Sequence, residues 1–258
     1  MSYQNVKFWR LVLLAALLGY LGGQIVHEAG HWAVLEIYRR SPVMSFTGLV
    51  QQDETPNHPE GWSQFTAPDG EQVWLHLATL PGSDTEWVLM LAAGPLAQVA
   101  AMLFGFALVH FGEREQVKVI GLLLALLNSF GPMLYQSRSM LGRGGGDEYL
   151  ITQFLGVPAA AVHVLFLAVA TAGLVVGMWN LAGWRTRLKW LGAVCIGFVG
   201  QGPLLMYANR ITRTQVGLGN PFFRPVLGWS LPVVIVSVVA GLALVVVLMR
   251  WENMGSMT

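Results

Sequence analysis

Six long apolar stretches constrain this chain more strongly than any other feature of its sequence. A run of about 20 apolar residues is long enough to cross the roughly 30 Å hydrocarbon core of a bilayer as a helix. The first stretch begins after Lys7 and Arg10 and ends near Tyr38, and the others cover Trp87–Phe111, Val117–Tyr135, Ala159–Trp184, Leu188–Ala208 and Leu231–Met249. The sequence therefore predicts an all-α polytopic membrane protein with about six transmembrane helices.

The composition supports this class and excludes others. Hydrophobic residues make up 54% of the 258 residues and charged residues only 11%, whereas about a quarter of an ordinary soluble domain is charged. A formal charge of +1 provides no basic field for nucleic acid, so the lipid bilayer is the expected partner. The predicted spans place eight lysine and arginine residues on one side of the membrane and seven on the other. The positive-inside rule therefore does not determine the orientation of the protein.

The connection between the first two stretches has a different character. Residues 41–85 carry six acidic residues and no lysine or arginine. Val43–Gln51 and Gln72–Thr79 are strand-like, and the segment between them is rich in proline and glycine. We expect a small membrane-associated β-hairpin here, and an irregular acidic loop is the alternative.

The first stretch ends in the sequence HEAGH, residues 27–31. Residues four apart share one face of a helix, so the imidazoles of His27 and His31 can reach one metal ion. Glu28 lies near the same face and can accept a proton from a metal-bound water as general base. Ionisable side chains within an apolar span are expensive in lipid and indicate function by default. The alternative is a set of hydrogen bonds between helices.

A catalytic zinc site usually has three protein ligands and one open position. His27 lies 17 residues after Arg10, a helix rise of roughly 25 Å, so we expect the metal near the far side of the membrane. The third stretch runs in the same direction as the first and is followed there by Asp147, which we predict to be the third ligand. A helix N-cap role is the alternative for Asp147, and both roles are compatible. His76 and Glu148 are the next candidates.

Two further segments place polar residues at membrane depth. The second stretch contains AAGPLAQ, residues 92–98, in which Gly94 permits close helix approach and Gln98 is a candidate substrate-binding residue. The third stretch carries Asn128 in a leucine-rich run, where its amide needs a hydrogen-bond partner, and then Pro132. A packing kink is the alternative for this segment. His163, in the fourth stretch, is expected to be a packed or a snorkelling residue.

Three features of the chain belong together. They are HEAGH in the first stretch, AAGPLAQ in the second, and the Asn, Pro and Asp at positions 128, 132 and 147. With these features the chain resembles the site-2 protease family of intramembrane zinc metalloproteases. The resemblance covers about residues 8–156. It implies that residues 41–85 guide an unwound substrate, and it implies a bacterial cytoplasmic membrane. The zinc ligands and the general base that it implies are His27, His31, Asp147 and Glu28.

Three departures from the family pattern are visible. Gln98 stands where the second motif usually has Asn, and Glu148 stands where the third motif has Gly after its Asp. About fourteen residues separate Pro132 from Asp147, where the family motif is compact. We expect a short insertion there that acts as a lid or a partner contact.

These observations predict a three-helix metalloprotease-like core over residues 1–156, which includes the hairpin, and three additional transmembrane helices over 157–258. The expected activity is zinc-dependent hydrolysis of a peptide bond in a membrane-protein or transmembrane-peptide substrate. Asn128 and Gln98 are expected to hydrogen-bond the substrate. The alternative is a non-catalytic scaffold or accessory subunit, whose partners would be other subunits of a membrane complex.

Overall fold

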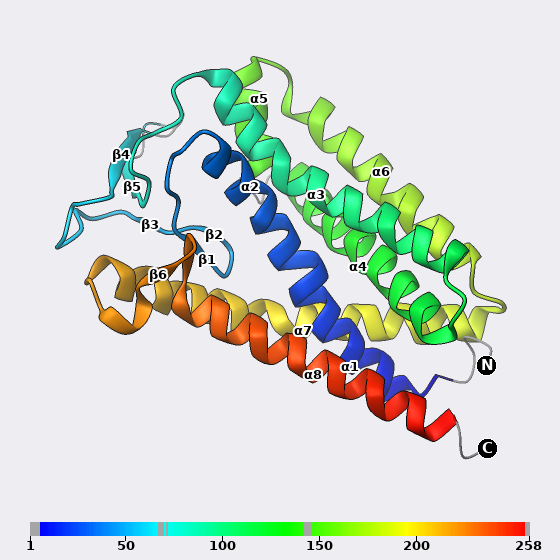
Figure 1. Cartoon of the computed structure of the whole chain (residues 1–258). Helices are drawn as coiled ribbons and strands as arrows, with labels where there is room; N and C mark the ends of the chain where they lie inside the picture. Colours follow the sequence, from blue (N-terminus) through cyan, green and yellow to red (C-terminus); the bar gives the residue numbers. More distant parts are fainter. Residues whose placement is uncertain (1–5, 67–69, 71, 142–145, 256–258) are drawn as a thin grey trace.

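The computed structural model describes residues 6–66, 70, 72–141 and 146–255. The protein is an all-α polytopic membrane protein, because six of its helices are long and apolar enough to cross a bilayer, and a small strand region lies at one end (Figure 1). In chain order the helical elements are α1 (Phe8–Leu18), η2 (Gly19–Ile25), α2 (Val26–Ile37), α3 (Asp84–Phe111), α4 (Glu115–Met140), α5 (Asp147–Leu155), α6 (Ala159–Trp179), α7 (Trp184–Gly217), η3 (Pro221–Phe223) and α8 (Leu231–Gly255).

The first span is a continuous helix with a widened turn in its middle. α1, η2 and α2 follow one another without a break, and η2 is a π-helix with the sequence GYLGGQI. Such wide turns are often found at functional sites. Asn128 of α4 donates a 2.9 Å hydrogen bond to the Gly22 carbonyl. The neighbouring helix therefore supports the wide turn directly before HEAGH.

The other spans lie on two sides of this first span. α3, α4 and α6 lie on one side, and α7 and α8 lie on the other (Figure 1). α3 and α4 cross closely, because an added side chain on either Gly105 or Gly121 would come within 2.6 Å of the other residue's carbonyl oxygen. The central apolar cluster is formed mainly by α1, α4 and α7, and it includes the fully buried side chains of Leu14, Leu122 and Trp190.

The strand region is more divided than the predicted hairpin. β4 (Ser63–Thr66) and β5 (Gln72–Leu75) form an antiparallel hairpin, and β3 (Gln51–Gln52) pairs with the other edge of β5. The predicted strand Val43–Gln51 is wrong as one element. It is broken into β1 (Met44–Ser45), β2 (Gly48–Leu49) and β3, because the chain turns before Gly48, which has a φ of +110°.

The second small sheet joins the two halves of the chain. β1 pairs in parallel with β7 (Trp229–Ser230), which pairs in antiparallel with β6 (Pro225–Val226). The strand order is β2-β1-β7-β6, so β2 is an edge strand. The segment after residue 156 therefore completes a sheet that begins directly after α2.

A bidentate ion pair fixes the connection between the strands and α3. Arg40 donates from Nε and Nη2 to the two carboxylate oxygens of Glu86 at 2.6 and 2.7 Å. Ser83 is the N-cap of α3, and its hydroxyl accepts a hydrogen bond from the Glu86 backbone N–H. The start of α3 is therefore held against the end of the first span.

The crossing of α3 and α4 predicts a large effect of added volume. Gly121→Val is expected to destabilise the protein by about 1–3 kcal/mol, because the new side chain overlaps the backbone of α3. The measurement is the thermal unfolding midpoint of the detergent-purified protein. Gly200→Val in α7 is the matched control, because nothing lies within 4 Å of the position of its added Cβ. Equal midpoints for the two variants would contradict the close crossing.

Candidate metal centre

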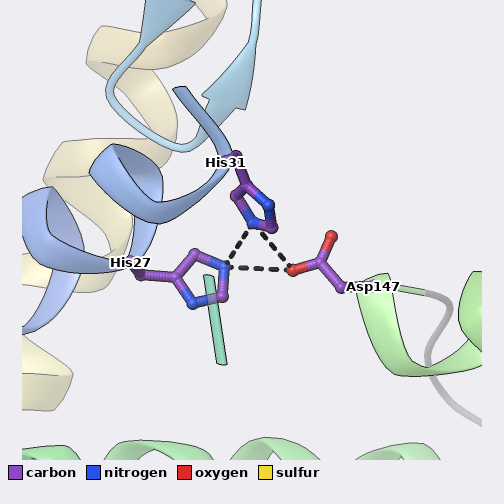
Figure 2. Close-up of side chains that lie close together, drawn as sticks. All are labelled: His27, His31 and Asp147. Carbon is purple, nitrogen blue, oxygen red and sulfur yellow. Dashed lines mark hydrogen bonds and ion pairs between the residues drawn. The ribbon is translucent and has the colours of Figure 1, made fainter. Parts of the chain in front are cut away.

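Three side chains from two helices converge on one point at the strand end of the bundle. His27 and His31 come from successive turns of α2, and Asp147 is the first residue of α5. Asp147 Oδ2 lies 3.0 Å from His27 Nε2 and 3.2 Å from His31 Nε2, and the two Nε2 atoms lie 3.0 Å apart (Figure 2). The structure thus brings together the three residues that the sequence singled out as ligands.

The spacing of the three donor atoms fits a metal ion. In a tetrahedral site with metal–ligand bonds of about 2.0–2.1 Å, neighbouring ligand atoms lie about 3.3 Å apart. Within the described part of the chain, His27, His31 and Asp147 are the group of side chains that can hold an ion. Burial acts to raise the pKa of Asp147, but the two facing imidazoles outweigh burial and hold this pKa below its usual range. Asp147 is therefore ionised and able to bind a cation.

A backbone carbonyl orients one of the two imidazoles. His31 Nδ1 donates a 2.6 Å hydrogen bond to the Met90 carbonyl of α3. In the neutral ring this leaves the lone pair of Nε2 directed at His27 and Asp147, which is the state that a metal ligand requires. His31 itself is buried. The second span therefore sets the direction of a ligand that belongs to the first.

Two glycines create the space for the imidazoles. A side chain on Gly30, inside HEAGH, would overlap the Ala93 carbonyl, and one on Gly94 would overlap the ring of His31 and lie 2.8 Å from His27 Cε1. The expected close approach at Gly94 is confirmed. α2 and α3 touch backbone to backbone at this level because both glycines lack a side chain.

Glu28 has one free carboxylate oxygen beside the three donors. Gln24, one turn earlier, donates a 2.7 Å hydrogen bond from Nε2 to Glu28 Oε1. Oε2 is buried and has no hydrogen-bond partner among the described residues. Glu28, His27, His31 and Asp147 all line one cavity of about 570 Å³. Glu28 thus lines the same cavity as the three metal-ligand residues and keeps one carboxylate oxygen without a hydrogen-bond partner among the described residues.

The cavity is enclosed by apolar side chains and by strand backbone. Its walls include Trp87 and Leu91 of α3, Phe65 and Leu75 of the hairpin, and residues 47–49 around the edge strand β2. Polar side chains, including Gln24, Gln98 and Glu148, also line the space, and a cavity in which polar groups converge beside apolar walls is typical of a ligand site.

The two predicted substrate-binding residues lie in different surroundings. Gln98 lines the large cavity and also a second cavity of about 10 Å³ behind it, whereas Asn128 lines only the second. Both amide hydrogens of Asn128 are committed, because its Nδ2 donates to the carbonyls of Gly22 and Leu124 at 2.9 Å each. The geometry gives Asn128 a role in holding the wide turn, and substrate contact by Gln98 stays a prediction.

A buried polar chain behind Asp147 was not predicted from the sequence. His163 Nδ1 of α6 donates to Gln136 Oε1 of α4 at 2.6 Å, and Gln136 Nε2 donates to Glu148 Oε1 of α5. All three residues are buried, and burial raises the pKa of Glu148. His163 is packed as expected, and Glu148 is engaged here instead of with the histidines. The chain fixes α5, and hence Asp147, relative to α4 and α6.

The alternative ligand His76 and also His58 lie outside the large cavity. His76 packs on Trp62 with ring centroids 4.7 Å apart, and burial lowers its pKa. His58 lies against Gly219. Of the insertion expected between Pro132 and Asp147, residues 133–140 continue α4, and residues 142–145 lie outside the described part of the chain.

Comparisons of the chain with protein-family models, with curated proteins and with solved structures find no match.

Metal analysis tests the three-ligand set. The detergent-purified protein is expected to hold about one zinc ion per chain, and His27→Ala and Asp147→Ala to lose it, because each removes one of three donors. The measurement is the zinc content by mass spectrometry of the purified protein. His58→Ala, at an exposed histidine, is the control and is expected to keep the metal. Retention of zinc by Asp147→Ala would show that the third ligand is another residue.

The buried hydrogen bonds among His163, Gln136 and Glu148 predict that Gln136 affects metal binding although it contacts none of the three metal-ligand residues. Gln136→Leu leaves Glu148 and His163 without their shared partner, and we expect the zinc affinity to fall about 10- to 100-fold. Competition with a chelator of known affinity measures this change. Ser137→Ala is the control, because the exposed Ser137 hydroxyl bonds only to the Met133 carbonyl of its own helix. An unchanged affinity in folded Gln136→Leu would show that packing alone positions α5.

Proposed function

We propose that this protein is an intramembrane zinc metalloendopeptidase that hydrolyses a peptide bond of a membrane-protein substrate within or near the bilayer. The observation that carries the proposal is that His27, His31, Asp147 and Glu28 line one cavity near the end of a membrane-spanning helix, and that the first three present ligand atoms close to one another. Two histidines and a carboxylate with room for a fourth group are the ligand set of a catalytic zinc site.

The chemistry divides between the ion and Glu28. His27, His31 and Asp147 would hold the zinc ion, which would supply a bound water of lowered pKa and a positive charge that polarises the scissile carbonyl. Glu28 accepts the proton of the attacking water at Oε2 and returns it to the amine that leaves. Gln24 keeps the carboxylate in place for both transfers by its bond to Oε1. The hydrogen bond from His31 Nδ1 to Met90 selects the tautomer of the neutral ring in which the lone pair of Nε2 is available to the ion.

The edge strand gives the substrate a place beside these groups. A transmembrane helix keeps its peptide carbonyls within its own hydrogen bonds, so the substrate has to unwind before cleavage. An extended peptide can then add to the free edge of β2, whose residues Gly48 and Leu49 line the cavity. Gln98 faces the same cavity from α3 and is our candidate for a further hydrogen bond to the peptide.

The non-catalytic alternative makes a different use of the same fold. A scaffold or accessory subunit would need neither the free oxygen of Glu28 nor a cavity beside it. We propose the enzyme because both are present. A bacterial cytoplasmic membrane is part of the proposal through the family resemblance.

Replacement of Glu28 tests the activity. Glu28→Gln is expected to reduce cleavage by about 100-fold or more, because the amide cannot accept the proton, while zinc content stays unchanged. The measurement compares membrane proteomes, and the new protein termini in them, from cells that express the wild type or the variant. The matched control is Glu36→Gln, an exposed carboxylate on the same helix. Identical termini in all three samples, with zinc bound, would favour the scaffold.

A further inference from the structure

One cation shares the cavity with Glu28, and it comes from the C-terminal part of the chain. Arg213 of α7 lines the cavity together with the metal-ligand residues. It is the only lysine or arginine among the described residues that form the lining. The motifs of the first 156 residues do not include it, and the hydrolysis described above does not use it.

Arg213 is held at one point beside Glu28 and the edge strand. A Cβ on Gly48 would lie 3.6 Å from Arg213 Nη2 and 3.9 Å from Glu28 Oε2. The guanidinium and the carboxylate therefore flank the same position on β2. Gln52 donates a 2.9 Å hydrogen bond to the Arg213 carbonyl, which fastens this turn of α7 to the strands.

Most of the hydrogen-bonding capacity of this guanidinium is unused. A guanidinium has five N–H donors, and Arg213 makes one side-chain hydrogen bond, from Nη2 to the Thr47 carbonyl at 3.3 Å. Its Nε is buried and has no partner among the described residues. It forms no ion pair with any described carboxylate, and Glu28 and Asp53 are the acidic groups that act on it electrostatically from a longer distance. A partly buried guanidinium with free donors is stabilised by a planar, anionic acceptor.

We propose that Arg213 binds a carboxylate of the substrate next to the bond that is cut. The inference rests on the proposed function for the presence of a peptide along β2. The carboxylate belongs either to an acidic side chain or to the C-terminus of a peptide already shortened by an earlier cut. Both present the same two oxygens to the fork of the guanidinium.

A binding measurement tests this assignment without depending on turnover. The protein is the zinc-loaded Glu28→Gln variant in detergent, and the probe is an apolar, fluorescein-labelled decapeptide. In one series of peptides, a single Glu or a single Gln is placed at each position in turn. In a second series, the C-terminus is either a free carboxylate or an amide. Fluorescence anisotropy gives the dissociation constants. We expect at least one carboxylate form to bind about 10- to 100-fold more tightly than its amide counterpart.

Replacement of Arg213 in that background is expected to remove this preference. Arg213→Gln should bind the acid and amide forms equally, and Arg213→Lys should keep part of the preference because it keeps the charge. Arg210→Gln, at an exposed arginine one turn earlier on α7, should leave the preference unchanged. Unchanged zinc content and a monodisperse elution profile establish that each variant is folded.

A second control separates binding from a purely structural role. Asn209 accepts a hydrogen bond from the Thr47 N–H at 3.2 Å, so it supports the same turn that Arg213 Nη2 contacts. If Arg213 acts only by holding this turn, Arg213→Gln and Asn209→Ala will weaken acid and amide peptides alike. That result overturns the proposal, as does a Glu28→Gln protein with Arg213 in place that shows no preference among the peptides or binds none of them.

The outcomes also distinguish this proposal from the proposed function. Peptides that bind through Arg213 but are not cut by the protein with Glu28 in place support the carboxylate site and count against the protease. Cleavage without any preference for a carboxylate supports the protease and overturns the role of Arg213. The preferred member of the series, internal Glu or C-terminal carboxylate, identifies the source of the charge.

Discussion

The burial of ionisable groups near the end of a membrane-spanning helix is the constraint on which the rest of the structure depends. His31 and Glu28 are almost fully buried, and charged or hydrogen-bonding groups are expensive there unless each atom has a partner. The neighbouring elements supply those partners. Met90 accepts from His31, Gln24 donates to Glu28, and Asp147 faces both imidazoles. Two buried atoms of the cluster, His27 Nδ1 and Glu28 Oε2, have no hydrogen-bond partner among the described residues.

Much of the fold and the grouping of the three candidate ligands can be predicted from the sequence, for identifiable reasons. The six spans follow from the length of the apolar runs, which is set by the thickness of the bilayer. His27 and His31 follow from helical spacing, and Asp147 follows from the direction of the third span. The polar chain from His163 through Gln136 to Glu148 could not be predicted, because it joins three elements whose side-chain directions depend on their packing.

The strand region shows where local sequence reasoning stops. Val43–Gln51 is strand-like in sequence, but the turn before Gly48 divides it. In the sequence only the glycine itself indicates this turn, and its positive φ is visible in the structure. The pairing of Met44 with Trp229 joins residues far apart in the sequence. The division of the chain at residue 156 therefore separates motifs, while the sheet beside the cavity and the position of Arg213 require both parts.

The π-helical segment η2 determines how the faces of α2 are rotated about the helix axis relative to those of α1. Each residue of an α-helix advances about 100° around the axis, so the wider η2 turn changes the angle between the packing face of α1 and the ligand face of α2. Loss of one glycine from this segment would let it wind as an ordinary helix and would swing both imidazoles away from Asp147. The length of this short segment thus sets the angle at which the packing face of the first span meets the two histidines of the candidate metal centre.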